Sequence, residues 1–485
     1  MEATLPISVA IKPGEKPSAL ALAPGVMPTA TPAATSLPLR FMACGLLSLL
    51  FGMGWLAIHP EILTTYHYNA NAVAVTHLFV LGWILTTVMG AMYQLVPVAL
   101  ETRLYSERLA RWQFIIHLTG FVGMVWMFRS WDMKQVGHFG SVLFFGLGLF
   151  TYNITRTLFR APKWNVVASA ITAALCWIVF AAVAGLSIAA AKCVYESIGE
   201  MPTGNTVSVI LRALRAVAGF VSHFSPLAAM HAHAHLGVVG FFIMLIVGVS
   251  YKLVPMFTLS EVQSPRRAAL SVGLLNMGLA GTFLSVLLQS AWKPVFALVI
   301  IIALAIYGFE LAAILRARKR STLDWGIRYF LTAIGMLAPL CLLGLFLSKP
   351  GLGLPEFNGQ LENIYGFLAL IGVVTFAILG MFYKIVPFLV WFGVYSGHIG
   401  KARVPPLTEM YSVRLQAAGY WLYLGGLLTS TAGALFRNEL VARSGCILLG
   451  IGVATVLVNL GLVVRHYFRP QLQPITKSIP RTSPA

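Results

Sequence analysis

Hydrophobic positions in this chain gather into blocks far longer than those of a soluble protein. Twelve apolar runs, each long enough to cross a bilayer as a helix, are separated by short polar segments. With no water available to the backbone inside a membrane, helices are the only spanning form that this pattern supports. The pattern therefore predicts an all-α polytopic membrane protein with twelve transmembrane helices, whose cores are 40–58, 72–98, 112–128, 138–155, 165–191, 227–251, 268–288, 294–315, 329–347, 364–392, 415–435 and 445–464.

Composition agrees with this prediction and marks the segments that fall outside it. The 485 residues are 58% hydrophobic and 10% charged, with a mean hydropathy of +0.82, which excludes an ordinary soluble domain. We expect residues 1–38, rich in Ala, Pro, Ser and Thr, to be a disordered cytoplasmic tail, 39–470 to be the membrane domain, and 471–485 to be a second tail. The long loop at about 193–226 predicts a helix that either lies in the membrane interface or caps the bundle.

The net charge of +19 is an orientation signal and does not indicate nucleic-acid binding. With the N-terminus inside, 25 of the 34 Lys and Arg residues fall on the cytoplasmic side. The other nine fall outside, where there are also seven acidic residues. This positive-inside bias predicts that both termini are cytoplasmic, with anionic membrane lipid as a partner. The five cysteines are scattered without a CxxC pair, which favours small apolar fillers over a disulfide or cysteine metal site.

Three segments of 21 residues align without gaps: HLFVLGWILTTVMGAMYQLVP at 77–97, HLGVVGFFIMLIVGVSYKLVP at 235–255 and FLALIGVVTFAILGMFYKIVP at 367–387. They share Gly-x7-Gly-x2-Tyr-x2-Val-Pro and correspond to the second, sixth and tenth predicted helices. The chain therefore consists of three four-helix arcs, at about 39–160, 161–320 and 321–470. The repeated tyrosines, Tyr93, Tyr251 and Tyr383, are expected to form an interfacial belt.

Three arcs of four helices, a histidine at the outer end of helix 2 and a His-x-His pair on another arc's second helix resemble subunit I of the haem-copper oxidases and nitric oxide reductases. His77 matches the helix 2 ligand of the low-spin haem, and HAH at 233–235 resembles the His-x-His motif. The resemblance implies haem b, a cytochrome c or quinol electron donor, a small gas ligand (nitric oxide or oxygen), and a bacterial-type inner membrane.

The sequence also departs from that superfamily. The His-x-His pair lies on helix 6 here and not on helix 10, which carries Tyr365 and Phe367 where a ligand is expected. Helix 7 lacks the adjacent histidines that hold the copper of the binuclear centre. The chain is thus a divergent relative, similar also to the haem- and copper-associated membrane proteins of the nitrosative-stress response.

The histidine positions themselves predict a haem site. Twenty residues separate each histidine from its proline, about 30 Å of helix, so His77 and His235 lie at matching depth. We expect their imidazoles to ligate one low-spin iron from opposite sides. Gly82 and Gly240, five residues below, admit either a flat macrocycle or a neighbouring helix.

Helical spacing separates the remaining histidines of the MHAHAH stretch. At 100° per residue His231 and His235 share a face, while His233 points the opposite way. We expect His233 to face the aromatic third arc, as the single ligand of a second, gas-binding haem. His231 is a further candidate metal ligand. His138 and His223 are expected on the surface, and His117, His398 and His466 are discounted because they lie toward the cytoplasm.

Two further features bear on function. In the superfamily the haem propionates rest against arginines between helices 11 and 12, which correspond here to Arg437 and Arg443, with Arg212 and Arg215 as a second option. No acidic residue lies at mid-membrane in the predicted helices, and Glu310 is near a cytoplasmic end, which argues against proton pumping.

Three functions stay open. The first is an oxidoreductase of the nitric oxide reductase or terminal oxidase type that does not pump protons. The second is a non-catalytic haem protein that binds nitric oxide. The third is a copper or zinc transporter, since His231 and His235 at i, i+4 have a reasonable metal spacing.

Overall fold

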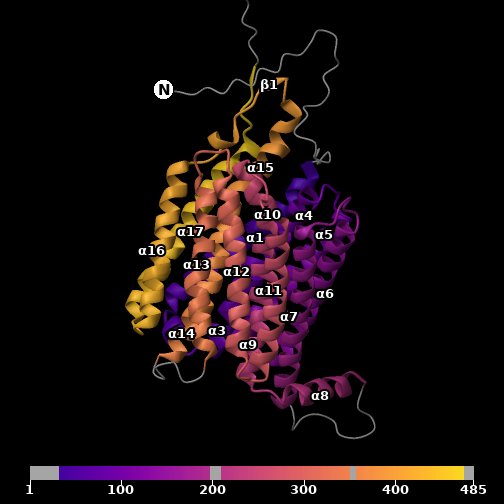
Figure 1. Ribbon diagram of the computed structural model, residues 1–485, viewed down its shortest axis with the longest axis vertical. Coiled ribbons are helices and arrows are strands. Elements are labelled where there is room, and N and C mark those ends of the chain that lie inside the picture. Colours follow the sequence, from indigo (N-terminus) through magenta and orange to yellow (C-terminus); the bar gives the residue numbers. More distant parts are fainter. Residues whose placement is uncertain (1–31, 197–208, 350–356, 475–485) are drawn as a thin grey trace, which may run out of the picture.

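The computed structural model describes residues 32–196, 209–349 and 357–474, which fold into one upright bundle of helices (Figure 1). Each of the twelve predicted apolar runs coincides, to within one residue, with a helix or with consecutive helical elements. The long elements are α1 (Pro32–Ile58), α3 (Ala70–His77) with η1 (Leu78–Leu85) and α4 (Thr86–Ala99), α5 (Glu107–Ser130), α6 (Met133–Leu158), α7 (Val166–Glu196), α9 (Pro226–His235) with η2 (Leu236–Ile243) and α10 (Met244–Thr258), α11 (Pro265–Leu287), α12 (Lys293–Arg316), α13 (Trp325–Ser348), α14 (Asn358–Phe367) with η3 (Leu368–Val374) and α15 (Thr375–Tyr395), α16 (Val413–Leu435) and α17 (Glu439–Phe468).

Shorter elements join them. These are α2 (Glu61–Thr64), α8 (Val209–Val221), the 3-10 turns η4 (Ser396–His398) and η5 (Leu407–Glu409), and the antiparallel strands β1 (Ala402–Arg403) and β2 (Gln473–Pro474). Within the described ranges, nine helices are long and apolar enough to span a membrane. The helices α5, α6 and α16 are not among those nine, although they have 24, 26 and 23 residues.

The three repeated segments form the centre of the bundle. In the most apolar window of 70–99, 226–258 and 358–398, 72%, 67% and 72% of residues are buried, against 22–50% in the six other candidate spans. Around them α6 packs on α7, α12 on α13, and α17 returns to α1, so the three arcs form a closed ring. Trp83 of the first arc donates from Nε1 to Oγ1 of Thr375 in the third, at 3.0 Å.

A polar residue in the last helix of each arc holds the start of that arc's third helix. Asn459 accepts from the backbone nitrogen of Ser412 at 2.7 Å and donates to its carbonyl at 2.9 Å. Glu310 accepts from the backbone nitrogens of Gln263 and Ser264 and from Nε of Arg267, and Asn153 plays this role in the first arc. Glu310 is therefore a structural cap, near a helix end as expected.

The prediction that three repeated tyrosines form an interfacial belt is wrong. Tyr93, Tyr251 and Tyr383 retain only 4%, 3% and 3% of their exposure, so they do not face lipid. Tyr93 instead donates to Gln113 on α5, and Tyr251 pairs with Ser271 on α11. Tyr93 and Tyr251 thus each turn toward the third helix of their own arc, while the buried hydroxyl of Tyr383 has no partner among the described residues.

The ends of the membrane domain also differ from expectation. Residues 32–38, which we expected to be a tail, begin α1, while 1–31 lie outside the described residues. Of the expected tail 471–485, β2 pairs with β1, and 475–485 are likewise outside the description. The loop helix expected within 193–226 is α8, which projects sideways from one end of the bundle (Figure 1) and leaves Val209 and Phe220 exposed. The five cysteines are free.

Candidate functional site

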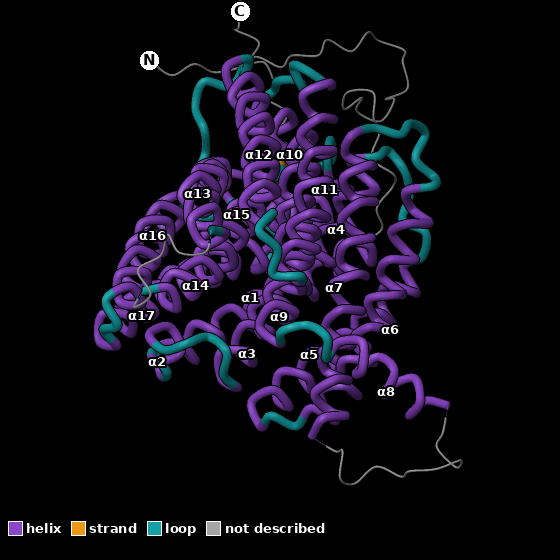
Figure 2. Tube along the Cα trace, turned by 60° about the horizontal axis from the view of Figure 1, so that its bottom comes forward, coloured by secondary structure: helices purple, strands orange, loops and turns teal. Residues whose placement is uncertain are grey.

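The helices α3, α9 and α14 lie together at the end of the bundle opposite β1 (Figure 1), which we call the histidine end. In Figure 2 this end comes forward, with α2 beside α3 and α14. A π-helical segment begins directly after His77, His235 and Phe367, the first residues of the three aligned segments. Such segments are rare and occur often at functional sites. The structure thus gives the three repeats one shared irregularity at the depth of the predicted ligands.

Three histidines at this end are fixed in the same way. The ring atom Nδ1 of His77 bonds the carbonyl of Val73 at 2.8 Å, and that of His235 bonds the carbonyl of His231 at 2.7 Å. Nδ1 of His233 bonds the carbonyl of Ala181 on α7 at 2.8 Å. A carbonyl only accepts, so each Nδ1 carries the hydrogen and each neutral ring keeps its Nε2 lone pair.

Those three Nε2 atoms have no hydrogen-bond partner among the described residues. All three side chains are half-buried. Their Nε2 atoms are not fully enclosed by protein. Each Nε2 therefore borders open space within the fold. A ring anchored through Nδ1 with a free Nε2 is the usual arrangement of a metal-ligating histidine.

The rings divide between two directions, as helical spacing predicts, but their neighbours differ from expectation. His233 points away from His231 and lies against α7, where a Cβ added to Gly185 would meet its ring at 2.9 Å. We expected His233 to face the third arc, and this was wrong because α7 of its own arc covers that face. His235 instead faces the third arc, with its ring centroid 6.1 Å from that of Tyr365.

His77 packs against Phe128, at 4.4 Å between ring centroids, and lies within electrostatic reach of His233. The pairing of His77 with His235 across one iron stays a prediction.

Protein atoms occupy the space beside the two repeated glycines, Gly82 and Gly240. A Cβ at Gly82 would meet Ser48 and Phe121 at 3.0 Å, and a Cβ at Gly240 would meet Trp177 and Leu279 at 2.7 Å. Of the two uses considered for these glycines, the close approach of a neighbouring helix is therefore the one that the structure has. Gly237, two residues after His235, has nothing within 4 Å of an added Cβ.

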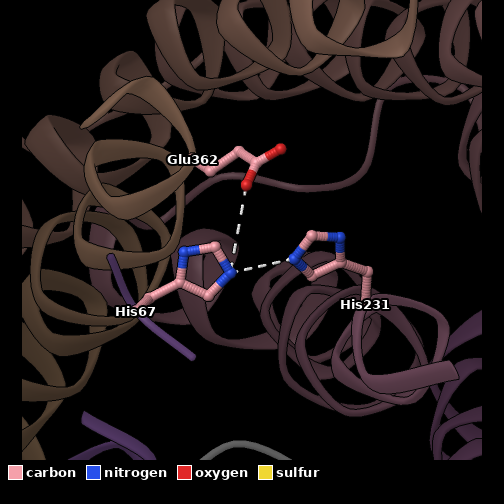
Figure 3. A group of neighbouring side chains, drawn as sticks. All are labelled: His67, His231 and Glu362. Atoms are coloured by element: carbon pink, nitrogen blue, oxygen red, sulfur yellow. Dashed lines mark hydrogen bonds and ion pairs between the residues drawn. The ribbon is translucent and has the colours of Figure 1, made fainter. Parts of the chain in front are cut away.

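His231 belongs to a cluster that the sequence did not reveal. Its Nε2 lies 3.0 Å from Nε2 of His67, which lies 4.0 Å from Oε2 of Glu362 (Figure 3). His67 comes from the segment between α2 and α3, and Glu362 from α14. The only signal in the sequence was that His67 and Glu362 fall shortly before predicted helices 2 and 10. His67 and His231 are 164 positions apart, so only tertiary packing brings them together.

The ring of His67 is oriented by its neighbour Asn363. Nδ1 of His67 donates to Oδ1 of Asn363 at 2.9 Å, while Nδ2 of that amide donates to the carbonyls of Leu63 and Thr65. Burial lowers the pKa of the His67 imidazole below its ordinary value, because desolvation of the charged ring outweighs the hydrogen bond with Asn363. The ring therefore favours the neutral form that binds metals.

The predicted arginines differ in their surroundings. Arg437, in the turn between α16 and α17, donates from Nη2 to Oε1 of Gln360 at 3.0 Å and so reaches the start of α14 at the histidine end. Arg443 is exposed on α17. Of the alternative pair on α8, Arg212 is exposed and Arg215 is half-buried.

The histidines that the sequence placed on the surface or discounted lie apart from the histidine end or at its surface, and Nδ1 of His117 is buried without a partner among the described residues. His138 and His223 are exposed, as expected. His117 is buried on α5, where its Nε2 bonds Oγ1 of Thr86 at 2.7 Å, and Nδ1 of His466 bonds the hydroxyl of Tyr395 at 2.6 Å.

Among solved structures, the chain is similar to one from a heme-copper terminal oxidase dimer determined by cryo-electron microscopy. The two share 12% sequence identity and superpose with a TM-score of 0.58, over 89% of this chain and 83% of the other. No protein-family model matches the sequence, and no curated protein matches it. The similarity extends over most of both chains and shows that they share a fold.

Proposed function

We propose that this chain is a haem-binding integral membrane redox protein of the haem-copper oxidase type. It crosses a bacterial-type inner membrane twelve times, with both termini in the cytoplasm. The shared fold and the nine candidate spans support the membrane part of the proposal. The remaining three long helices, α5, α6 and α16, complete three arcs of four.

One observation carries the haem part of the proposal. His77, His233 and His235 each donate from Nδ1 to a backbone carbonyl, and each leaves a partnerless Nε2 at the border of open space. A ring held through Nδ1 with its Nε2 lone pair left free is the arrangement of a ligating histidine, so its recurrence on three neighbouring histidines favours a bound group. Neutral imidazoles are ordinary axial ligands of haem iron, so the donor set fits.

The contacts favour a particular division of these ligands. His235 faces Tyr365 in the third arc, so we assign it to a second haem. His77 of the first arc and His233 of the second then form the low-spin pair. A bound haem would supply a one-electron carrier and, with an open coordination position, a site for nitric oxide or oxygen. The backbone carbonyls keep the rings in the required tautomer.

Visible spectra of the purified full-length protein test this proposal. We expect b-type bands in the reduced-minus-oxidised spectrum, and loss of the low-spin signal in His77→Ala and His233→Ala but not in His235→Ala. His223→Ala, at an exposed position, is the matched control. A colourless wild-type protein would overturn the proposal, and loss of the low-spin signal in His235→Ala with its retention in His233→Ala would restore the pair first expected from the sequence.

Catalysis is a separate part of the proposal. We propose an oxidoreductase that takes electrons from a cytochrome c or a quinol and passes them to nitric oxide or oxygen, without pumping protons. The buried carboxylate of Glu310 supports the last point, because Arg267 and two backbone N–H groups hold it. Consumption of the gas by the reduced protein tests turnover, and gas binding without consumption would establish the non-catalytic alternative instead.

A further inference from the structure

The three arcs of the bundle each contribute one potential metal ligand to a single point at the histidine end. His67 comes from the first arc, His231 from the second and Glu362 from the third (Figure 3). Their ligand atoms all lie within 4.8 Å of one another. All three side chains are half-buried, so an ion can reach them from outside. These residues are distinct from the three histidines assigned to haem.

The spacing of the ligand atoms suits a small cation. Metal-bound nitrogen and oxygen atoms at bonds of about 2.0–2.1 Å in a tetrahedral site lie roughly 3.3 Å apart. The two Nε2 atoms are 3.0 Å apart, and Oε2 of Glu362 is 4.0 Å from Nε2 of His67. A small rotation of the flexible Glu362 side chain closes the remaining gap.

The first ligand is already oriented for this role. Because Nδ1 of His67 donates to Asn363, its Nε2 lone pair points toward His231 and Glu362. A ligating histidine that donates its other N–H to an amide or carbonyl oxygen is the usual outer-shell arrangement. The amide orientation is itself fixed, since the nitrogen of Asn363 donates to two backbone carbonyls.

We propose that His67, His231 and Glu362 bind one divalent transition-metal ion of the zinc and copper class. Two imidazoles and one carboxylate are a set that such ions prefer, and three protein ligands leave one position open to water or substrate. The ion ties the three arcs together at the histidine end. It is independent of any haem, because it shares no ligand with His77, His233 or His235.

A neighbouring positive charge is expected to weaken metal binding at this site. Lys293, at the start of α12, lies close enough to interact with both His231 and Glu362. Its positive charge opposes binding of a cation. Removing that charge is therefore expected to tighten metal binding, which a purely structural hydrogen-bonded cluster would not predict.

The test uses full-length protein in detergent, freed of metal with a chelator and then titrated with Zn²⁺, with bound zinc measured by elemental analysis. We expect one tightly held zinc per chain, and an affinity at least tenfold lower in His67→Gln, His231→Gln and Glu362→Gln. Lys293→Gln should bind zinc at least twofold more tightly. His223→Gln, an exposed histidine at the same end, should match the wild type.

Unchanged zinc stoichiometry and affinity in the three ligand variants would overturn the proposal, as would equal loss in His223→Gln. If the ligand variants fail to fold, Lys293→Gln decides, because unchanged affinity there contradicts the site. Haem spectra of the same samples separate this proposal from the proposed function. His67→Gln and Glu362→Gln should lose zinc and keep haem, whereas a haem-free wild type that binds zinc would sink only the haem proposal.

Discussion

Asn153 and the backbone of Ser106 hold each other through two hydrogen bonds. Oδ1 of Asn153 accepts from the Ser106 nitrogen at 3.0 Å, and its Nδ2 donates to the Ser106 carbonyl at 2.8 Å. Asn153 is fully buried and lies 47 positions away along the chain. Asn459 repeats the arrangement with Ser412. The link fixes where the third helix of an arc begins against the fourth.

Replacing this amide tests the link. Asn153→Leu keeps the volume but strands two backbone groups of Ser106, so we expect the free energy of unfolding to fall by about 1–3 kcal/mol. Thermal unfolding in detergent, followed by cysteine-reactive dye, measures the change. Thr119→Leu, at an exposed position on α5, is the control, and an equal melting temperature for both variants would contradict the role of Asn153.

Two substitutions of Glu310, which plays the corresponding role in the second arc, distinguish the contribution of hydrogen bonding from that of charge. Glu310→Gln keeps an oxygen for the backbone nitrogens of Gln263 and Ser264 but loses the ion pair with Arg267. Because the Arg267 side chain is 46% exposed, solvent screens that pair, and we expect a loss of less than about 1 kcal/mol. Glu310→Leu also strands the backbone groups and should cost about 1–3 kcal/mol more. Comparable stabilities of the two variants would show that charge, and not capping, dominates.

Close packing of α16 on α17 gives a third prediction. A Cβ at Gly433 would lie 2.3 Å from the backbone nitrogen of Ala442, so Gly433→Ala must push the two helices apart. We expect a loss of about 1–3 kcal/mol. At Gly450, on the same pair of helices, the nearest atom to an added Cβ is 3.8 Å away, so Gly450→Ala should be neutral or slightly stabilising. Melting temperatures in detergent distinguish the two.

The two arginines predicted to hold haem propionates should differ in a redox titration. Arg437 reaches α14 through Gln360, whereas Arg443 is exposed on α17. A cation near a haem stabilises the reduced form, so Arg437→Gln should lower the midpoint potential, and Arg443→Gln should leave it unchanged. An equal shift in both variants would indicate a general surface-charge effect and remove Arg437 from the site.

The sequence predicted the helices well because long apolar runs leave few alternatives in a membrane. The repeat at 77, 235 and 367 also placed two histidines at equal depth. The contacts between arcs were beyond such reasoning. Nothing local says that His67 meets His231 or that α7 covers His233, because both follow from how distant helices pack. The burial of Tyr93 and Tyr251 was missed for the same reason, since their hydrogen-bond partners lie on other helices.

The wide helical turns after His77, His235 and Phe367 have a consequence for how this architecture can change. A wide turn holds one residue more than the ordinary turn, so losing a single residue there would restore regular winding and rotate everything beyond it by about 100°. The imidazoles of His77 and His235 would then point in another direction, while the helix beyond the deletion kept its neighbours. A lineage could therefore gain or lose its ligand geometry in one arc through a one-codon event, without rebuilding the bundle.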